Sequence, residues 1–325
     1  MIRFIRFGLI TGAVLITILD IAGISRLPDT PWTGIRHNNL VFIEIEDESP
    51  NGSLPLKRGD EIAAVDGSPV RNINHFRCLT EAPGRFESQV YTVARGNSIL
   101  EVDVKRIPLP VKKVYRRVAS SLTAFTFIFL GLVVLLRRPD QLGFLFAVNC
   151  LTIAFLFTIR PVTPLPFFHL AGELVYDFMM VFLPAFFLHF FLVFPGKEIT
   201  SGSRRYLIRK TLYIPPTLIF LALFIMAMLR YSSGIERGLV LVLNGVTSIY
   251  WLLYMLASVF FFVRTYLTSD RIQKVKFRIA AIGLTLGVLP LLLVMVIRFF
   301  LPNVQNPHDH YPVHVSYTKL RAHET

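Results

Sequence analysis

The amino-acid sequence predicts a polytopic α-helical membrane protein with about seven spans and one mostly-β domain between the first and second spans. Hydrophobic residues make up 53% of the chain and charged residues only 17%, whereas soluble domains carry about 25% charged residues. Most of the apolar runs contain about 17–25 residues, which is enough helix to cross ~30 Å of hydrocarbon. The seven runs are Phe7–Ile24, Val118–Leu136, Leu142–Ile159, Leu174–Phe194, Leu212–Leu229, Leu239–Val263 and Ile279–Leu301.

These runs divide the chain into four parts. The first is a single span, the second a polar inserted domain, the third a bundle of six spans and the fourth a polar tail. Their expected boundaries are residues 1–25, 26–110, 111–301 and 302–325.

The positions of Lys and Arg predict the orientation of the spans. Most of these residues in the short connections fall on one side, at residues 3–6, 137–138, 197–210 and 264–278. The opposite short connections hold only Arg160, Arg230 and Arg237. Because basic loops stay in the cytoplasm, we expect a cytoplasmic N-terminus and an outer inserted domain. The net charge of +13 therefore indicates orientation and contact with the lipid bilayer, not nucleic-acid binding.

The first span is expected to be an uncleaved signal anchor, and a cleaved signal peptide is the alternative. Its apolar stretch is long for a signal peptide, and no convincing small-x-small cleavage site follows it. Asp20 lies near the outer end of this span. A carboxylate inside a membrane is a functional candidate, and an ordinary acid at the outer interface is the other interpretation.

Alternating apolar residues and tight-turn signals predict that the insert is mostly β-structure. Asp66-Gly67 and Gly96-Asn97 supply the positive φ angles of hairpin turns. A short helix is expected from Asn74 to Thr80. The expected strands are Leu40–Ile45, Glu61–Val65, Val90–Ala94 and Ile99–Val104.

Within residues 36–106 the insert resembles a PDZ domain. The matching positions are Leu56, Gly59, Asp60, Ile62, Val65, Asp66, Gly67 and Val70. The resemblance implies that an extended peptide adds as a strand to a sheet edge. It places the groove on a strand with Leu40 and Phe42 and on a helix with His75 and Leu79. His75 is otherwise an ordinary helix residue.

The resemblance is incomplete at the loop that would hold a peptide carboxylate. Gly34 is the only glycine between Arg26 and Leu40, so no Gly-Leu-Gly-Phe-like loop precedes Leu40. Docking of a protein segment without a free carboxylate is therefore the alternative to peptide binding.

The fourth run carries further polar candidates. His189 is an intramembrane histidine that could relay protons or bind a ligand, or stay neutral and hydrogen-bonded. Pro184 should kink the helix. Glu173 and Asp177 are expected at the outer start of this span, as caps or as a contact for a cationic ligand.

Together with the inserted domain, the stretch Leu188–Pro195 resembles the N-terminal sensory region of bacterial membrane signalling proteins. These precede a cytoplasmic histidine kinase or serine phosphatase. The resemblance implies a multi-pass protein of the bacterial inner membrane that detects a peptide or protein outside. A homodimer is one option for its oligomeric state. The alternative is a membrane scaffold or protease-associated protein that recruits partners through its PDZ-like domain.

We expect no enzymatic activity, cofactor or metal. The sequence contains no His-Glu-x-x-His metal motif, nucleophile elbow, phosphate-binding loop or dinucleotide fingerprint. Cys78 and Cys150 are too far apart in the expected topology to form a disulfide. The tail holds His308, His310, His314 and His323, and its abrupt change of composition suggests a truncated remnant of a longer sensor.

Overall fold

The structure, a computed structural model, divides into two compact units. Residues 1–243 form the first unit and residues 244–325 belong to the second. The described residues are 2–38, 40–46, 48–70, 73–80, 86–96, 98–159, 166–194, 211–232 and 237–268. The seventh predicted span and the histidine-containing tail lie outside them.

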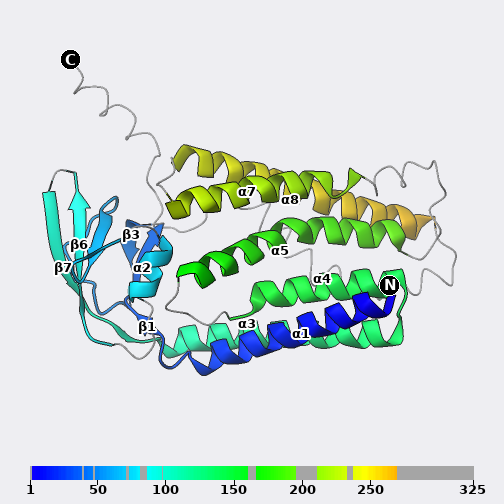
Figure 1. The fold of residues 1–325 in the computed structure, drawn as a ribbon, viewed down its shortest axis with the longest axis horizontal. Coiled ribbons are helices and arrows are strands. Elements are labelled where there is room, and N and C mark those ends of the chain that lie inside the picture. The colour runs from blue at the N-terminus through cyan, green and yellow to red at the C-terminus, as the bar shows by residue number, and fades with distance from the viewer. Residues whose placement is uncertain are drawn as a thin grey trace, which may run out of the picture. The chain divides into compact units, whose positions relative to one another are not determined.

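Long apolar helices make up most of the described chain (Figure 1). They are α1 (Ile2–Ser25), α3 (Val111–Arg137), α4 (Gln141–Phe157), α5 (Pro166–Val193), α7 (Ile214–Ser232) and α8 (Arg237–Leu267). Four segments are long and apolar enough to cross a membrane, namely Phe4–Ser25, Val111–Arg137, Phe167–Val193 and Val242–Leu267. Helices α4 and α7 contain shorter apolar stretches. The structure thus agrees with a helical membrane protein, and the total of seven spans stays a prediction.

Helices α3 and α5 begin well before the apolar runs that predicted them. Helix α3 starts at Val111, so the basic residues that precede the run belong to the helix. Helix α5 starts at Pro166, a residue that suits a first helical turn because it has no amide hydrogen to satisfy. Glu173 therefore lies inside α5 and is not at its start, which corrects the sequence prediction. Asp177 follows it one turn later in the same helix.

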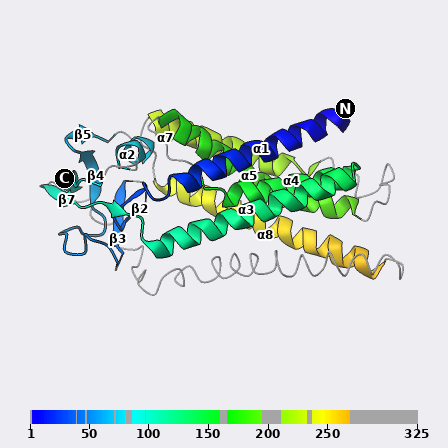
Figure 2. The ribbon, with the colours of Figure 1, turned by 90° about the horizontal axis from the view of Figure 1, so that it is seen from below.

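Between α1 and α3 the chain forms a sheet domain, residues 31–108. Its elements are β1 (Pro31–Trp32), β2 (Ile35–Asn38), β3 (Val41–Ile45), β4 (Glu61–Val65), β5 (Ser68–Pro69), α2 (Ile73–Thr80), β6 (Gln89–Arg95), β7 (Ser98–Val104) and β8 (Ile107–Pro108). The main sheet has the order β2-β3-β4-β6-β7, with β5 paired to β4. All of its pairs are antiparallel. Figure 2 shows this domain beyond the ends of α1 and α3.

The predicted strands and the short helix of the insert are confirmed. Strand β4 has the predicted bounds, and β3, β6, β7 and α2 differ by a single residue at their ends. At the β4–β5 turn, Asp66 and Gly67 have φ angles of +50° and +72°, which are the left-handed values that a tight hairpin needs. Strands β1, β2, β5 and β8 were not predicted.

A compact apolar core holds α2 against the sheet. Its buried members are Ile62, Val65, Phe76, Tyr91, Val93, Val102 and Val104. The Phe76 ring packs edge-on against Tyr91, with centroids 5.8 Å apart. Because Phe76 is only 3% exposed, it anchors α2 to the middle of the sheet.

A partly buried ion pair fixes the loop before β4 to the end of β6. Arg95 donates from Nε to Oδ1 of Asp60 at 2.8 Å and from Nη2 to Oδ2 at 2.7 Å. These bonds hold the pKa of Asp60 below its usual value, against the opposing effect of burial and with help from the Lys57 amide. The Asp60 side chain is 2% exposed, so the pair lies at the edge of the core.

The two ends of the sheet domain pair with each other. Strand β1 follows α1, strand β8 precedes α3, and the two form a short antiparallel ribbon with Trp32 opposite Ile107. The chain therefore enters and leaves the sheet domain through two paired strands, one following α1 and the other preceding α3.

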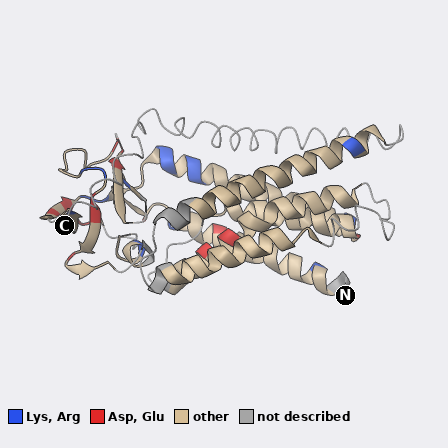
Figure 3. Ribbon diagram, turned by 90° about the horizontal axis from the view of Figure 1, so that it is seen from above, with Lys and Arg blue, Asp and Glu red and all other residues tan. Residues whose placement is uncertain are grey.

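Small residues allow close packing of α1, α3 and α4. Their shared core contains Ala13, Ile16, Ala124, Ile128, Leu151, Ala154 and Phe155. A Cβ at Gly131 of α3 would lie 2.9 Å from the Cβ of Cys150 in α4, so the glycine lets these helices approach. Figure 3 shows many charged residues in the sheet domain and near helix ends, a few acidic residues within the helices, and long uncharged stretches of helix.

Candidate functional site

Strand β2 provides an end of the sheet that could accept another strand. In the described part of the chain, β2 pairs with β3 alone and stands last in the strand order. Its His37 ring lies edge-on to Phe76 of α2, with centroids 4.9 Å apart. The strand and α2 therefore border the same region, which is the arrangement that strand-adding peptide sites use.

The structure separates the predicted groove residues. Strand β3 lies between β2 and β4, so Leu40 and Phe42 flank no open edge. The Leu40 carbonyl accepts from Ile62 N at 2.9 Å, and Phe42 N donates to Asp60 O at 2.8 Å. The edge strand is thus β2, which precedes the expected strand β3 in the chain. His75 and Leu79 lie on α2 and are half-buried. A ligand-binding role for all four stays a prediction.

The segment before β2 is held by a polar cluster that the sequence analysis missed. Asn51 is 1% exposed. Its Nδ2 donates to the carbonyls of Thr33 and Lys105, both at 2.8 Å, and its Oδ1 accepts from Lys105 N at 2.9 Å. Ser49 Oγ donates to Thr33 O at 2.6 Å. An Asn in a Ser/Pro/Gly-rich loop was the available signal, but its partners are distant in sequence.

This cluster affects what the site can bind. The Ile35 amide, at the start of β2, donates to Thr33 Oγ1 at 3.2 Å. Amides at the start of a groove strand are the donors that hold a peptide carboxylate. Since this one already has an acceptor, the geometry suits an extended segment along β2 better than a carboxylate at its start.

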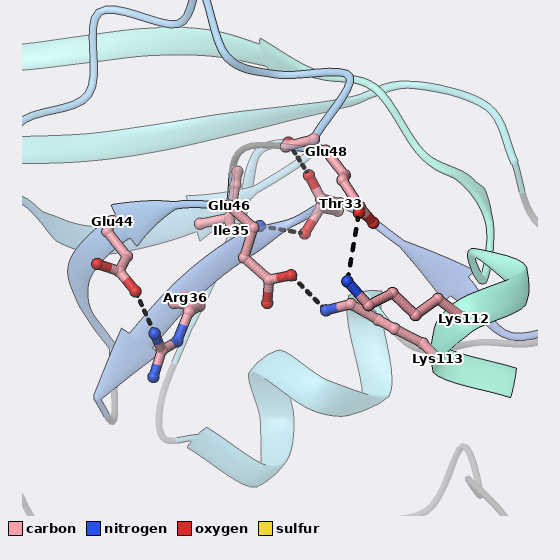
Figure 4. A network of polar contacts seen from close by, with 9 residues as sticks. Thr33, Ile35, Arg36, Glu44, Glu46, Glu48, Lys112 and Lys113 are labelled. Carbon is pink, nitrogen blue, oxygen red and sulfur yellow. Dashed lines mark hydrogen bonds and ion pairs between the residues drawn. The ribbon is translucent and has the colours of Figure 1, made fainter. Parts of the chain in front are cut away.

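Lysines at the start of α3 tie the sheet domain to that helix (Figure 4). Lys113 forms an ion pair with Glu46, which follows β3. Its Nζ also lies 4.8 Å from the centroid of the Trp32 ring, within range of a cation–π contact. Lys112 Nζ lies 3.9 Å from Glu48 Oε1. The link therefore joins α3 both to the β1–β8 ribbon and to the main sheet.

A second link joins α2 to α5. Arg77 Nη1 lies 2.7 Å from Glu173 Oε1. Both side chains are about one-third exposed, at 36% and 34%. The predicted site residue Glu173 thus contacts the helix that borders β2. Asp177 is half-buried one turn further along α5.

Asp20 is buried where three helices meet. It is 0% exposed, and its Oδ1 accepts from Ser121 Oγ and from Ile159 N, both at 2.8 Å. Its Oδ2 has no hydrogen-bond partner among the described residues. A Cβ at Gly23 would lie 2.0 Å from the Ile159 carbonyl oxygen, so α1 approaches the backbone that follows α4 very closely. Asp20 therefore connects α1 to α3 and to the end of α4, and its carboxylate is buried.

His189 belongs to an aromatic contact between α5 and the segment before α7. Its Nδ1 lies 2.7 Å from the Tyr213 hydroxyl. Phe182 and Phe186 of α5 also pack near the Tyr213 ring, with centroids 6.4 and 6.1 Å away. The bond fixes the imidazole orientation, and a proton-relay or ligand role stays a prediction.

The described residues contain no group of three or more His, Cys, Asp or Glu side chains that could hold a metal ion. Cys78 and Cys150 form no disulfide bond. No protein-family model, curated protein or solved structure matches the chain.

Proposed function

We propose that this chain is the membrane sensory module of a signalling protein. In this proposal the sheet domain is PDZ-like, lies outside the cytoplasm and binds an extended peptide or protein segment along β2. The membrane helices then carry the change to the cytoplasmic side. Support comes from the apolar helices, the position of β2 at the end of the described sheet, and the ion pairs between the sheet domain and the helices.

The observation that carries the proposal is the Arg77–Glu173 ion pair. Arg77 lies on α2, which borders β2, and Glu173 lies in α5, which is long enough to cross a membrane. An exposed ion pair contributes only about 0–1 kcal/mol to stability. A segment added along β2 would press on α2 and change the position of this pair. The pair would then transmit the binding event from α2 to α5, although it adds little to stability.

Hydrogen exchange of the full chain in lipid nanodiscs tests the proposal. The probe is the peptide fraction secreted by the source cells, with retained peptides identified by native mass spectrometry. We expect a retained peptide to slow amide exchange in β2 and α2 and to change exchange in the first half of α5. If no peptide is retained, or if exchange in β2 does not change, the proposed ligand recognition is wrong.

Reversing the charge of Arg77 tests the coupling itself. Arg77→Glu should leave peptide binding within about twofold and abolish the exchange response of α5, since it places two acids together. The double variant Arg77→Glu/Glu173→Arg restores opposite charges and should restore the response. A response that persists in the single variant would exclude this ion pair as the coupling element.

The second candidate function is a membrane scaffold that recruits a protein partner through the same edge. The bond from the Ile35 amide to Thr33 favours it, because it leaves one donor fewer for a free carboxylate. For a scaffold, amidated and free C-terminal peptides should bind equally, with exchange changes confined to β2 and α2. Such a result would favour the scaffold over the sensor.

A further inference from the structure

The first turns of α3 carry more positive charge than the helix itself favours. Lys112, Lys113, Arg116 and Arg117 all lie within this region. Cations are unfavourable near a helix N-terminus because of the helix dipole. The cluster also lies on the side that the positive-inside rule leaves poor in basic residues. Other groups must therefore offset this charge.

The sheet domain offsets only part of it. Lys113 is 22% exposed and is committed to Glu46 and the Trp32 ring. Lys112 remains 86% exposed and lies 3.9 Å from an exposed Glu48, a pair that contributes little in water. Arg116 is exposed one turn further along the helix. Lys112 and Arg116 are thus available to a partner.

These two cations lie beside an exposed apolar stripe on the same helix. Along the stripe, Tyr115 is 71% exposed, Leu122 is 62% exposed and Phe129 is 66% exposed. With 100° per residue, the stripe and the two cations share one half of the α3 surface. Tyrosine and long basic side chains are typical of the level at which a helix leaves the hydrocarbon.

We propose that this face, made of Lys112, Tyr115 and Arg116 with Leu122 and Phe129, binds an anionic phospholipid of the outer leaflet. The two cations would contact the lipid phosphate, and the Tyr115 hydroxyl would donate a hydrogen bond to a headgroup oxygen. Leu122 and Phe129 lie about 10 and 20 Å from Arg116 along the axis, so they would follow the acyl chains across one leaflet of ~15 Å. The inference rests on the membrane placement of α3 and not on ligand recognition along β2.

An anionic lipid suits this surface better than a soluble acidic peptide. The cations and the apolar residues form one continuous face, and a phospholipid contains both complementary parts. An acidic peptide would satisfy Lys112 and Arg116 but would leave the Leu122 and Phe129 surface to other molecules. The proposal therefore predicts that binding needs the acyl chains.

Native mass spectrometry of the full chain tests the proposal. The protein is reconstituted with equal amounts of phosphatidylglycerol and phosphatidylcholine, and the lipids retained after release are counted. We expect wild type to retain phosphatidylglycerol preferentially. Lys112→Gln/Arg116→Gln should reduce this preference about tenfold or more, because each cation near an anionic surface contributes about 1 kcal/mol.

The matched control is Lys57→Gln/Lys105→Gln, which removes the same charge from exposed positions of the sheet domain and should keep the preference. An equal preference in both double variants would overturn the proposal. So would displacement of the lipid by millimolar glycerol phosphate, since that would indicate a simple anion site. A measurement on wild type needs no variant: raising the salt concentration should weaken phosphatidylglycerol retention, and no salt effect would also overturn the proposal.

Discussion

Asp20→Leu is expected to lower the free energy of unfolding of the helical region by about 2–4 kcal/mol. Leucine leaves the Ser121 hydroxyl and the Ile159 amide without their shared acceptor. An unsatisfied buried donor costs about 1–3 kcal/mol, and polar contacts between membrane helices contribute up to about 2 kcal/mol each. The measurement is thermal denaturation of the purified protein in detergent, followed by circular dichroism.

Two variants separate hydrogen bonding from charge at this position. Asp20→Asn keeps a carbonyl oxygen that can accept from both donors, so less than half of the loss is expected. Ser121→Ala removes one donor and should cost less than Asp20→Leu. If Asn destabilises as much as Leu, the negative charge matters more than the shared acceptor. A Leu variant as stable as wild type would mean that Asp20 does not hold these helices together.

Arg95→Met should destabilise the sheet domain by about 2–3 kcal/mol. The change leaves the Asp60 carboxylate, 2% exposed, with only the Lys57 amide as an observed donor. Removing one partner of a fully buried ion pair costs about 3–5 kcal/mol. We expect a smaller loss here because Arg95 is one-third exposed. Hydrogen exchange in β4 and β6 of the full chain measures the change.

The same ion pair predicts an acid-dependent stability. The pKa of Asp60 is lowered in the folded state, chiefly by the hydrogen bonds from Arg95. A lowered folded-state pKa gives stability that is fully present above the unfolded value of about 3.9 and is lost as pH falls through the folded value. The difference between wild type and Arg95→Met should therefore shrink below pH ~4. A difference independent of pH would indicate lost packing and not lost pairing.

Local patterns were sufficient to predict much of the fold. The turn after β4 follows from Asp66-Gly67, because a left-handed turn needs these residue types wherever it occurs. The alternation in β6 and β7 and the apolar composition of α1 and α3 likewise depend only on neighbours in sequence. Apolar runs alone misplaced the start of α5, since Glu173 interrupted the run and its partner, Arg77, lies far away in the sequence.

The candidate site depended on contacts that no local pattern contains. Strand β2 has the sequence Ile-Arg-His-Asn, which lacks the apolar alternation of a buried strand because it stands at the end of the sheet. The PDZ resemblance placed the groove strand at Leu40 and Phe42 instead. Asp20 was recognised as a candidate because a carboxylate in an apolar run is unusual. Its partners, at residues 121 and 159, follow only from the packing of three helices.

The β1–β8 ribbon makes the sheet domain a replaceable insert. Pro31 and Pro108 face each other in the ribbon, and paired Cα atoms in antiparallel strands lie about 4.5–5.5 Å apart. Since the two ends of the domain lie side by side, a tight turn of a few residues in place of the domain would span the gap between Pro31 and Pro108. A foreign domain with adjacent termini could be grafted at this point without changing how α1 meets α3. The sheet domain can therefore change while the helices keep their arrangement.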